Sequence, residues 1–192
     1  MIFFTSDLHF GHFGIINYCS RPFNSVEEMD AALITNWNTT VGKCDDVYIL
    51  GDFTMRPAQD AHKYIAQLNG RKYLIKGNHD KFLKGRYPYK QDFEWVKDYH
   101  VLHEQGKRII LFHYPILEWD CYYRGSIHLY GHVHNSATSK KLTQFLKGLA
   151  FNVGVDCNEF YPVSINSIID KAGQSRQNDT VRIISTETEI SM

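Results

Sequence analysis

Short runs of apolar, β-branched and aromatic residues recur along the chain and are separated by polar segments. The runs Ile2 to Thr5, Val47 to Leu50 and Tyr73 to Ile75 are each too short for a helix and rich in residues that favour strands. Between them lie two longer segments in which apolar residues recur at helical spacing. The order strand, helix, strand, helix, strand, with short crossovers, predicts parallel strand pairing in the first half of the chain.

The two helical segments have recognisable starts. Ser25 with Glu28 three residues later is typical of a capping box, and Pro57 is expected in the first turn of the second helix. The apolar stripes are Met29, Ala32, Leu33 and Trp37 in the first helix, and Ala61, Tyr64, Ile65 and Leu68, ending before Gly70, in the second. Both helices are expected to pack on the sheet.

The second half of the chain is less helical. Tyr99 to Glu104 and Lys107 to Phe112, separated by Gln105 and Gly106, predict a hairpin. Another strand is expected to end at Tyr130, and Ser164 to cap a helix through Lys171.

Three further segments have less regular patterns. Phe151 to Val155 is predicted as a strand, and the overlapping segment Asn152 to Asp156 as a strand and turn, with a contact to metal ligands as the alternative. Lys81 to Lys90 is a basic loop, interpreted as solvated surface or as a guide for a polyanionic substrate. The tail from Ser175 to Met192 is polar, and a strand is considered at Val181 to Ile184.

The composition fits a single domain over residues 1–192. Hydrophobic residues make up 43% and charged residues 22% of the chain, which is enough to bury a core. Because 21 basic residues balance 21 acidic ones, no overall positive field attracts nucleic acid or an anionic membrane. Nucleic acid is therefore an unexpected partner, although a local patch stays open, and the oligomeric state is not predicted.

The cysteines and the terminus suggest a cytoplasmic protein. The four cysteines, Cys19, Cys44, Cys121 and Cys157, are far apart and form no CxxC pair, so we expect reduced thiols. No basic segment precedes the first apolar run, so a secretory signal is not expected. No stretch approaches the roughly 20 apolar residues that span a bilayer.

Five of the apolar runs end on residues with oxygen or imidazole side chains. These are Asp7 and His9, Asp52, Asn78 with His79 and Asp80, His113, and His132 with His134. In α/β proteins, ligands bind in the crevice beyond the carboxyl ends of the strands. One such residue commonly only turns the chain after a strand, but five such endings predict a common site. In HVH, two imidazoles on the same side of an extended segment favour metal binding by His132 and His134.

The candidate metal ligands are carboxylates, imidazoles and a carboxamide, without thiolates. Such ligands suit hard to borderline divalent ions, so we expect Mn, with Fe, Zn, Ni or Co as alternatives, and so many imidazoles disfavour calcium. The candidates Asp7, His9, Asp52, Asn78, His113, His132 and His134 outnumber the three or four protein ligands of one catalytic zinc, so two ions that share Asp52 are expected. Paired metals roughly 3.5 to 4 Å apart clamp the oxygens of a phosphoryl group, which predicts phosphoester hydrolysis.

Short motifs at these positions resemble those of the calcineurin-like metallophosphoesterases. The motifs are DLH at Asp7, GDF at Asp52, GNHD ending at Asp80, His113 after an apolar strand, and GHVH ending at His134. Each motif alone is weak, but all of them in this order identify the chain as a member of that superfamily. The resemblance implies an α/β fold, a four-layer α/β/β/α sandwich with mixed sheets.

The resemblance also implies roles for individual residues. One metal would be held by Asp7, His9, Asp52 and His134, and the other by Asp52, Asn78, His113 and His132. A water or hydroxide between the ions would attack phosphorus, and His79 would donate a proton or hydrogen bond to the leaving oxygen, a role that suits imidazole. Asp80 would orient His79 or a group outside the metal ligands. The expected substrate is a small phosphodiester, such as a nucleotide or cyclic nucleotide.

The loop after Asp52 departs from the family pattern. Where many members have GDxxDR, this chain has Met55 in place of the second aspartate and retains Arg56. Arg56 is expected either to contact substrate phosphate or to lock the loop. His12 is interpreted either as a substrate contact or as an exposed loop histidine.

Three other functions are weighed against this one. The same site would serve a phosphomonoesterase. A non-catalytic metal-binding scaffold of the same fold is disfavoured because His79 and all the ligands are present. A one-zinc hydrolase of the metallo-β-lactamase type is disfavoured because its HxHxDH order differs from the DLHFGH of this chain.

Overall fold

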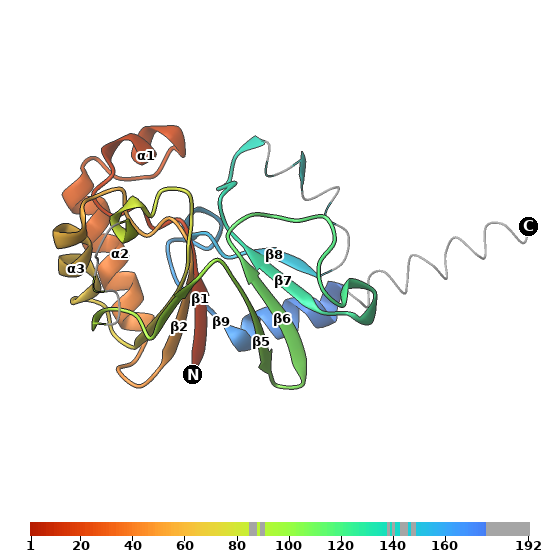
Figure 1. The fold of residues 1–192 in the computed structure, drawn as a ribbon. Coiled ribbons are helices and arrows are strands. Elements are labelled where there is room, and N and C mark those ends of the chain that lie inside the picture. The colour runs from red at the N-terminus through yellow and green to blue at the C-terminus, as the bar shows by residue number, and fades with distance from the viewer. Residues whose placement is uncertain are drawn as a thin grey trace, which may run out of the picture.

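Two β-sheets lie side by side in the molecule, with helices beside them (Figure 1). The computed structural model describes residues 1–84, 88, 91–137, 139, 141–142, 146 and 149–175. The first sheet has five strands in the order β4-β3-β2-β1-β9, and the second has four in the order β5-β6-β7-β8. Each sheet contains both parallel and antiparallel pairs. The predicted α/β fold with two mixed sheets is therefore confirmed.

The first sheet is built on the three strands predicted from the first half of the chain. Its strands are β1 (Ile2–Thr5), β2 (Asp46–Leu50), β3 (Arg71–Ile75), β4 (Trp95–Lys97) and β9 (Val163–Ser164). Strands β1 to β4 run parallel, as predicted for the first three, and β9 is antiparallel to β1. The sequence did not predict β4 and β9, because strands of two or three residues are too short to show a period.

Helices α2 (Val26–Thr40) and α3 (Ala58–Ile65) cover one side of this sheet, and α1 (Phe13–Tyr18) lies beyond the carboxyl ends of its strands (Figure 1). The predicted cap of α2 is confirmed, since Oγ of Ser25 accepts a hydrogen bond from the backbone N–H of Glu28 at 3.1 Å. Pro57 is the N-cap of α3 and not part of its first turn. Because α3 ends at Ile65, Leu68 lies in the turn that follows, where it is still buried.

Alternation along the strands divides the core into two layers. Phe3, Val47, Ile49 and Leu74 pack with the helices, together with Met29, Leu33 and Trp37 of α2. Their neighbours Phe4, Tyr48, Leu50 and Ile75 pack with Ile109, Leu111, Ile127 and Leu129 of the second sheet. Successive side chains of a strand point to opposite faces, so β1, β2 and β3 each serve both layers.

The second sheet consists of β5 (Tyr99–Glu104), β6 (Lys107–Phe112), β7 (Ile127–Tyr130) and β8 (Ala150–Asn152). The predicted hairpin is confirmed with its bounds, and Gln105 and Gly106 both have positive φ, as a two-residue hairpin turn requires. A strand was predicted over Phe151 to Val155, but β8 ends at Asn152, so the prediction is wrong for the last three of these residues. The backbone N–H of Val155 donates a hydrogen bond to the carbonyl of Ser6, and a 3-10 turn, η4 (Val155–Cys157), begins at this residue.

Residues 165–175 form a helix that joins the second apolar layer. Oγ of Ser164 accepts from the backbone N–H of Ser167 at 3.2 Å, so the predicted cap is confirmed, and the helix continues beyond Lys171. The strand considered at Val181 to Ile184 and part of the Lys81 to Lys90 loop lie outside the described residues. In the part of the chain that the structure describes, no helix combines the length and apolar character needed to cross a membrane.

His128 is a fully buried histidine on β7. Its Nδ1 lies 3.3 Å from the carbonyl oxygen of Ile110 and its Nε2 3.2 Å from that of Tyr114. Neutral imidazole has one N–H and can donate to only one of these oxygens. The two carbonyl oxygens raise the pKa of His128, but burial lowers it by more, to about 4. The ring is therefore neutral in the folded protein.

We therefore predict that acid destabilises the fold through His128. Because its pKa is lowered on folding, the unfolded chain takes up the proton first, so the stability is complete above about pH 6.5 and is lost as the pH falls toward 4. At pH 5 the loss should be about 2 kcal/mol. Urea unfolding of metal-free protein at pH 8 and pH 5 measures it, with His128→Phe as a comparison that cannot titrate there. Equal losses in the two proteins would contradict this account.

Candidate metal centre

The candidate ligands lie where strands from both sheets end (Figure 1). Asp7 and His9 follow β1, Asp52 follows β2, Asn78 follows β3, His113 follows β6, and His132 and His134 follow β7. A hydrogen bond joins the two sheets at this edge, since Nδ1 of His113 lies 2.7 Å from the carbonyl oxygen of Leu50 at the end of β2. The structure therefore brings all the strand ends singled out in the sequence to one region.

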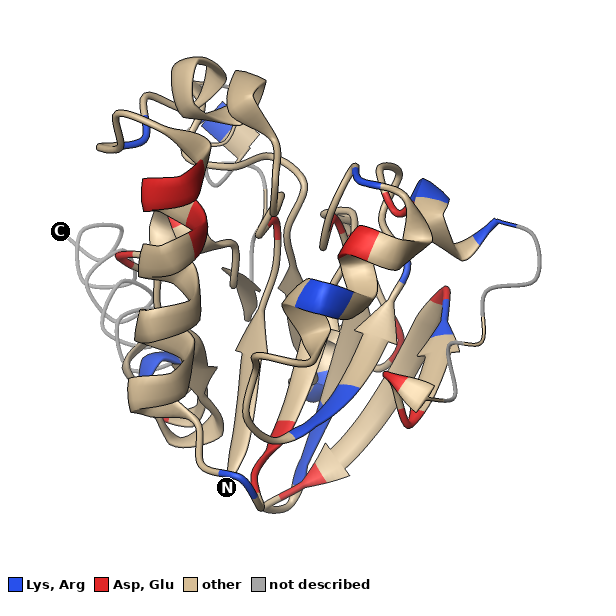
Figure 2. Cartoon of the chain, turned by 90° about the vertical axis from the view of Figure 1, so that its left-hand side faces the viewer, with Lys and Arg blue, Asp and Glu red and all other residues tan. Residues whose placement is uncertain are grey.

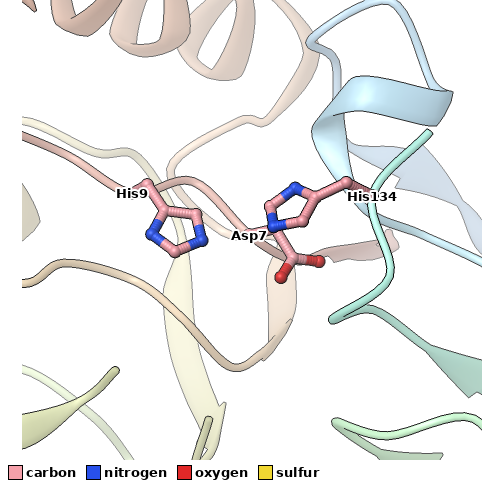
Figure 3. Close-up of side chains that lie close together, drawn as sticks. All are labelled: Asp7, His9 and His134. Atoms are coloured by element: carbon pink, nitrogen blue, oxygen red, sulfur yellow. The ribbon is translucent and has the colours of Figure 1, made fainter. Parts of the chain in front are cut away.

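Asp7, His9 and His134 form a first group (Figure 3). One carboxylate oxygen and one ring nitrogen from each histidine lie within 4.8 Å of one another. All three residues have left-handed backbone, with φ of 58°, 53° and 48°. This conformation is uncommon for residues other than glycine and tends to cluster at functional sites. The loops are thus held in shapes that bring these side chains together.

Asp52, His113 and His132 form a second group, again with one ligand atom from each within 4.8 Å of the others. Asn78 adjoins it, since its Oδ1 lies 3.1 Å from Nε2 of His113. Because Nδ1 of His113 is occupied by the carbonyl of Leu50, Nε2 is the nitrogen that faces the group. A histidine that ligates a metal through one nitrogen usually donates from the other in this way.

The carboxylate of Asp52 lies between the two groups. Its Oδ2 is 3.6 Å from Nε2 of His9 in the first group and 3.5 Å from Nε2 of His113 in the second. Its Oδ1 accepts a hydrogen bond from the backbone N–H of His79 at 2.8 Å. Burial alone would raise the pKa of Asp52, but His113 and this N–H lower it to about 2. The carboxylate is therefore ionised beside both groups.

The surroundings of His9 fit a bound cation. The residue is 2% exposed, and neither ring nitrogen has a hydrogen-bond partner among the described residues. A buried polar group without a partner costs about 1 to 3 kcal/mol. Burial lowers the pKa of His9 to about 3, so its ring is neutral and keeps a lone pair for a metal. With the carboxylates of Asp7 and Asp52 nearby, the donor set suits a divalent ion.

Glycines allow the ligand loops to approach each other closely. Gly51 has a φ of 90°, and a Cβ there would lie 2.7 Å from Cα of Gly77 and would also collide with the ring of His113. A Cβ on Gly77 would collide with the carboxylate of Asp52. A larger residue at either position would push the loops after β2 and β3 apart.

Asp80 ties the same two loops together. Its Oδ2 accepts from the backbone N–H groups of Asp52 at 3.0 Å and Gly77 at 2.8 Å, and its Oδ1 from that of Phe53 at 2.8 Å. Burial raises the pKa of Asp80 to about 6 against the lowering effect of these N–H groups. These contacts give Asp80 a role that the sequence did not indicate, as a brace between the two loops, and its expected role in orienting His79 or a group outside the metal ligands stays a prediction.

Comparison with known proteins connects this geometry to a family. The family model for calcineurin-like phosphoesterases matches residues 1–136, a stretch that contains every candidate ligand. The chain belongs to this family. Calcineurin-like phosphoesterases are metal-dependent and use divalent ions, for which the two groups around Asp52 are candidate sites.

Similar proteins extend the match over most of the chain. An uncharacterized protein of Methanocaldococcus jannaschii is 35% identical over 170 residues, which are 88% of this chain and 89% of that protein. The gene 66 protein of Mycobacterium phage L5 is 30% identical in a match that covers 80% of this chain and 85% of that protein. A crystal structure of a protein of unknown function from Aquifex aeolicus matches with a TM-score of 0.71 at 30% identity and covers 89% of this chain and 98% of that one.

A cavity of about 630 Å³ opens beside the candidate metal ligands of this calcineurin-like phosphoesterase. His79 and His12 both line it, with ring centroids 5.4 and 5.5 Å from that of His9. Nδ1 of each ring is buried and has no hydrogen-bond partner among the described residues. Both histidines are thus placed where a substrate would enter, and their roles stay predictions.

Met55 and Arg56 take different positions around this cavity. Met55 lines it, whereas Arg56 is not among the described residues that do so. The side chain of Arg56 lies over Gly11, because a Cβ on that glycine would meet Cγ of Arg56 at 2.7 Å. Its backbone N–H donates to Oγ1 of Thr54 at 3.0 Å. These contacts favour the loop-locking role of Arg56 over the phosphate contact.

The backbone of the GHVH motif differs from the expectation. We expected an extended segment with both imidazoles on one side, but β7 ends at Tyr130, and His132 and His134 have φ of 70° and 48°. His132 therefore joins the second group and His134 the first. The extended conformation was wrong because the chain turns here: the backbone N–H of His132 donates to the carboxylate of Asp7 at 2.9 Å, and that of Val133 donates to the carbonyl of Gly131 at 2.9 Å.

A buried ion pair that the sequence did not reveal holds the first group in place. Both oxygens of Asp156 accept from the guanidinium of Arg21, at 2.8 and 2.9 Å, and its Oδ2 lies 2.7 Å from Nδ1 of His134. Arg21 also donates to the backbone carbonyls of Asp7 at 2.7 Å and Leu8 at 3.0 Å. The pair therefore braces both the loop after β1 and the ring of His134.

The sequence offered a signal for only one member of this pair. Asp156 ends the segment Asn152 to Asp156, which was interpreted as a strand and turn. The alternative interpretation of that segment, a contact to metal ligands, agrees with the position of Asp156 beside the candidate ligand His134. Arg21 has no motif around it, and spacing does not distinguish a buried arginine from an exposed one. Burial alone would lower the pKa of His134, but Asp156 raises it to about 10. The negative field that favours a charged imidazole also favours a metal cation.

Replacing Asp156 by Asn should weaken metal binding at the first group. The amide removes the negative charge and one acceptor for Arg21, so the affinity of one bound ion should fall about 10- to 100-fold. Titration with Mn²⁺, followed through the EPR signal of the free ion, measures the affinity. Asp170→Asn, an exposed change on the last helix, controls for charge.

The Asp156→Asn protein must first be shown to fold. An unpaired buried arginine costs about 3 to 5 kcal/mol, which urea unfolding would reveal. If the folded variant binds every Mn²⁺ ion as tightly as the wild type, Asp156 does not support metal binding at the first group.

Proposed function

We propose that this chain is a phosphodiesterase that depends on two metal ions. The observation that carries the proposal is the position of Oδ2 of Asp52, within 3.6 Å of ring nitrogens from both ligand groups. A carboxylate in this position suits two cations held side by side. We assign one ion to Asp7, His9, Asp52 and His134, and the other to Asp52, Asn78, His113 and His132.

Mn²⁺ is the proposed ion at both positions, with Fe, Zn, Ni or Co as alternatives. The donor set of carboxylates, imidazoles and a carboxamide suits these borderline ions. When bound, two such ions would clamp phosphoryl oxygens and make water a better nucleophile at neutral pH. The chain's own contribution is to hold the ligands in place and to position a proton donor.

His79 is the proposed proton donor to the leaving oxygen. Its backbone N–H is fixed by Oδ1 of Asp52 at 2.8 Å, so the shared carboxylate sets its position. Its ring lines the cavity, and its Nδ1 has no partner among the described residues. A general acid must be within hydrogen-bond reach of the atom that it protonates, and a substrate in this cavity would meet that condition. His12, on the wall of the same cavity, is proposed to contact the phosphate.

Hollows on two sides of the ligands favour a diester over a monoester. One is the cavity lined by His79, and a second, of about 400 Å³, is lined by the neighbouring residue Asn78 together with Gly77 and Tyr114. A diester carries groups on two ester oxygens and needs space for both, whereas a monoester needs only one. Cavities of this size fit small molecules. The proposed substrate is therefore a small phosphodiester, such as a nucleotide.

The charge distribution supports a small substrate. In Figure 2, Lys and Arg are interspersed with Asp and Glu over the described residues, and the net charge of the whole chain is zero. A protein that tracks along nucleic acid usually has a basic stripe. We also propose a cytoplasmic location, which the unpaired state of all four cysteines supports.

His79→Ala in the Mn²⁺-loaded protein tests both the reaction and the donor. The wild type should hydrolyse bis(4-nitrophenyl) phosphate faster than 4-nitrophenyl phosphate. The variant should lose about 10²- to 10⁴-fold in kcat on the dinucleotide thymidylyl-thymidine, whose leaving alkoxide needs a proton. The loss on bis(4-nitrophenyl) phosphate should be much smaller, because 4-nitrophenolate leaves without a proton. Absorbance and chromatography measure the two reactions.

His103→Ala is the matched control, since His103 is an exposed histidine on β5 and outside the cavity. It should leave both reactions unchanged. Failure of the fully metal-loaded wild type to turn over either nitrophenyl ester would refute the proposed activity. Equal losses of the His79→Ala protein on both diesters would show that His79 does not donate the proton.

A further inference from the structure

The two cavities beside the metal ligands differ in their chemistry. No Asp, Glu, Lys or Arg is among the described residues that line the cavity of His79, whereas three lysines and two aspartates line the cavity of Asn78. From this contrast we propose that the substrate is an unsymmetrical phosphodiester. Its leaving oxygen carries an apolar or aromatic group, and the group retained on phosphorus carries a second negative charge. This inference rests on the proposed function, since it uses the same ligands and the same donor.

The cavity of His79 has an apolar rim. Ile15 and Tyr18 of α1 line it together with Met55 and Val133, and α1 stands beyond the carboxyl ends of the strands (Figure 1). Tyr18 is 82% exposed and Met55 42% exposed, although both are large. Large apolar side chains exposed together beside a site often mark a binding surface. An aromatic ring at such a rim is suited to stack on a flat group such as a nucleobase.

The cavity of Asn78 has free positive charge. Its two acidic residues are already engaged, because Asp98 forms an ion pair with Lys76 at 2.6 Å and the oxygens of Asp80 accept three backbone N–H groups. Among the described residues, no ion pair involves the other two lysines on its wall, Lys81 and Lys84. Two ammonium groups on one concave surface suit a carboxylate or a phosphate group.

The positions of Asn78 and His79 set the direction of the substrate. The two residues are neighbours in the chain, yet Asn78 lines the basic cavity and His79 the apolar one. Because His79 protonates the leaving oxygen, that oxygen lies on the apolar side. Water adds to phosphorus, the P–O bond on that side breaks, and the leaving oxygen takes the proton of His79. The products are an alcohol with the apolar group and a phosphomonoester with the anionic group.

Three diesters with the same 4-nitrophenyl leaving group test the basic cavity. Their retained groups are ethyl, choline and 2-carboxyethyl, which are neutral, cationic and anionic. The Mn²⁺-loaded wild type should have a kcat/KM about 10-fold higher for the carboxyethyl than for the ethyl diester, and lower still for the choline diester. Replacing both lysines, Lys81→Gln with Lys84→Gln, should abolish this preference, so that kcat/KM becomes about equal for the carboxyethyl and ethyl diesters.

A second double variant controls for net charge. Lys43→Gln with Lys171→Gln removes the same two charges from exposed positions outside both cavities and should keep the preference. Binding gives a readout apart from turnover. By calorimetry, 2-carboxyethyl phosphate should bind the Mn²⁺-loaded wild type about 10-fold more tightly than ethyl phosphate, and the two should bind the Lys81 and Lys84 double variant about equally.

Tyr18→Ala tests the apolar cavity. The substrates are two diesters that retain 2-carboxyethyl and release either 4-nitrophenol or trifluoroethanol. For each ester, the kcat/KM of the variant is divided by that of the wild type, so that the intrinsic reactivity of the ester cancels. This ratio should fall about 5- to 10-fold for the 4-nitrophenyl ester and change little for the trifluoroethyl ester. Tyr123→Ala is the matched control, because Tyr123 is 84% exposed and lines neither cavity.

The outcomes separate the inference from the proposed function. No turnover of any of these diesters by fully loaded wild type would overturn the proposed function, and this inference with it. Turnover with the same kcat/KM for all three retained groups, or an equal effect of Tyr18→Ala on both leaving groups, would overturn the inference alone and leave the phosphodiesterase in place.

Discussion

One carboxylate has to stay ionised while it is buried between two clusters of imidazoles, and the arrangement of the site follows from that constraint. An isolated carboxylate at 1% exposure would be driven to take up a proton. At Asp52 the backbone N–H of His79 and the ring of His113 stabilise the charge. Strand β2 lies between β1 and β3 in its sheet, so loops from both neighbours reach its end.

Two other carboxylates, those of Asp80 and Asp156, hold the loops in place. Neither belongs to the two groups of candidate ligands that meet at Asp52. Asp80 fastens the loops after β2 and β3 through backbone amides, and Asp156 fastens the loop after β1 to His134 through Arg21. These braces hold loops whose left-handed backbone would otherwise relax. The cavity walls come from α1, from η1 (Lys81–Leu83) and from the ligand loops themselves, since His9, His132 and His134 line one cavity and Asn78 and Asp80 line the other. The loops that carry the candidate ligands therefore also shape both cavities.

The sequence singled out the candidate ligands because each follows an apolar run long enough to be recognised as a strand. It also revealed the helices and the hairpin, whose spacing and turn residues are local signals. Contacts between distant segments left no such signal: Arg21 and Asp156 are 135 positions apart, and β4 and β9 exist only because a neighbouring strand pairs with them. The turn at His132 was missed for the same reason, since the backbone N–H of His132 donates to the carboxylate of Asp7, 125 positions away in the chain.

Anomalous diffraction from Mn²⁺-loaded crystals tests most directly whether Asp52 is shared. The account predicts two peaks of comparable height about 3.5 to 4 Å apart, one beside Asp7, His9 and His134 and one beside Asn78, His113 and His132, with the carboxylate of Asp52 in contact with both. A single peak, or two peaks of which only one touches Asp52, would contradict it.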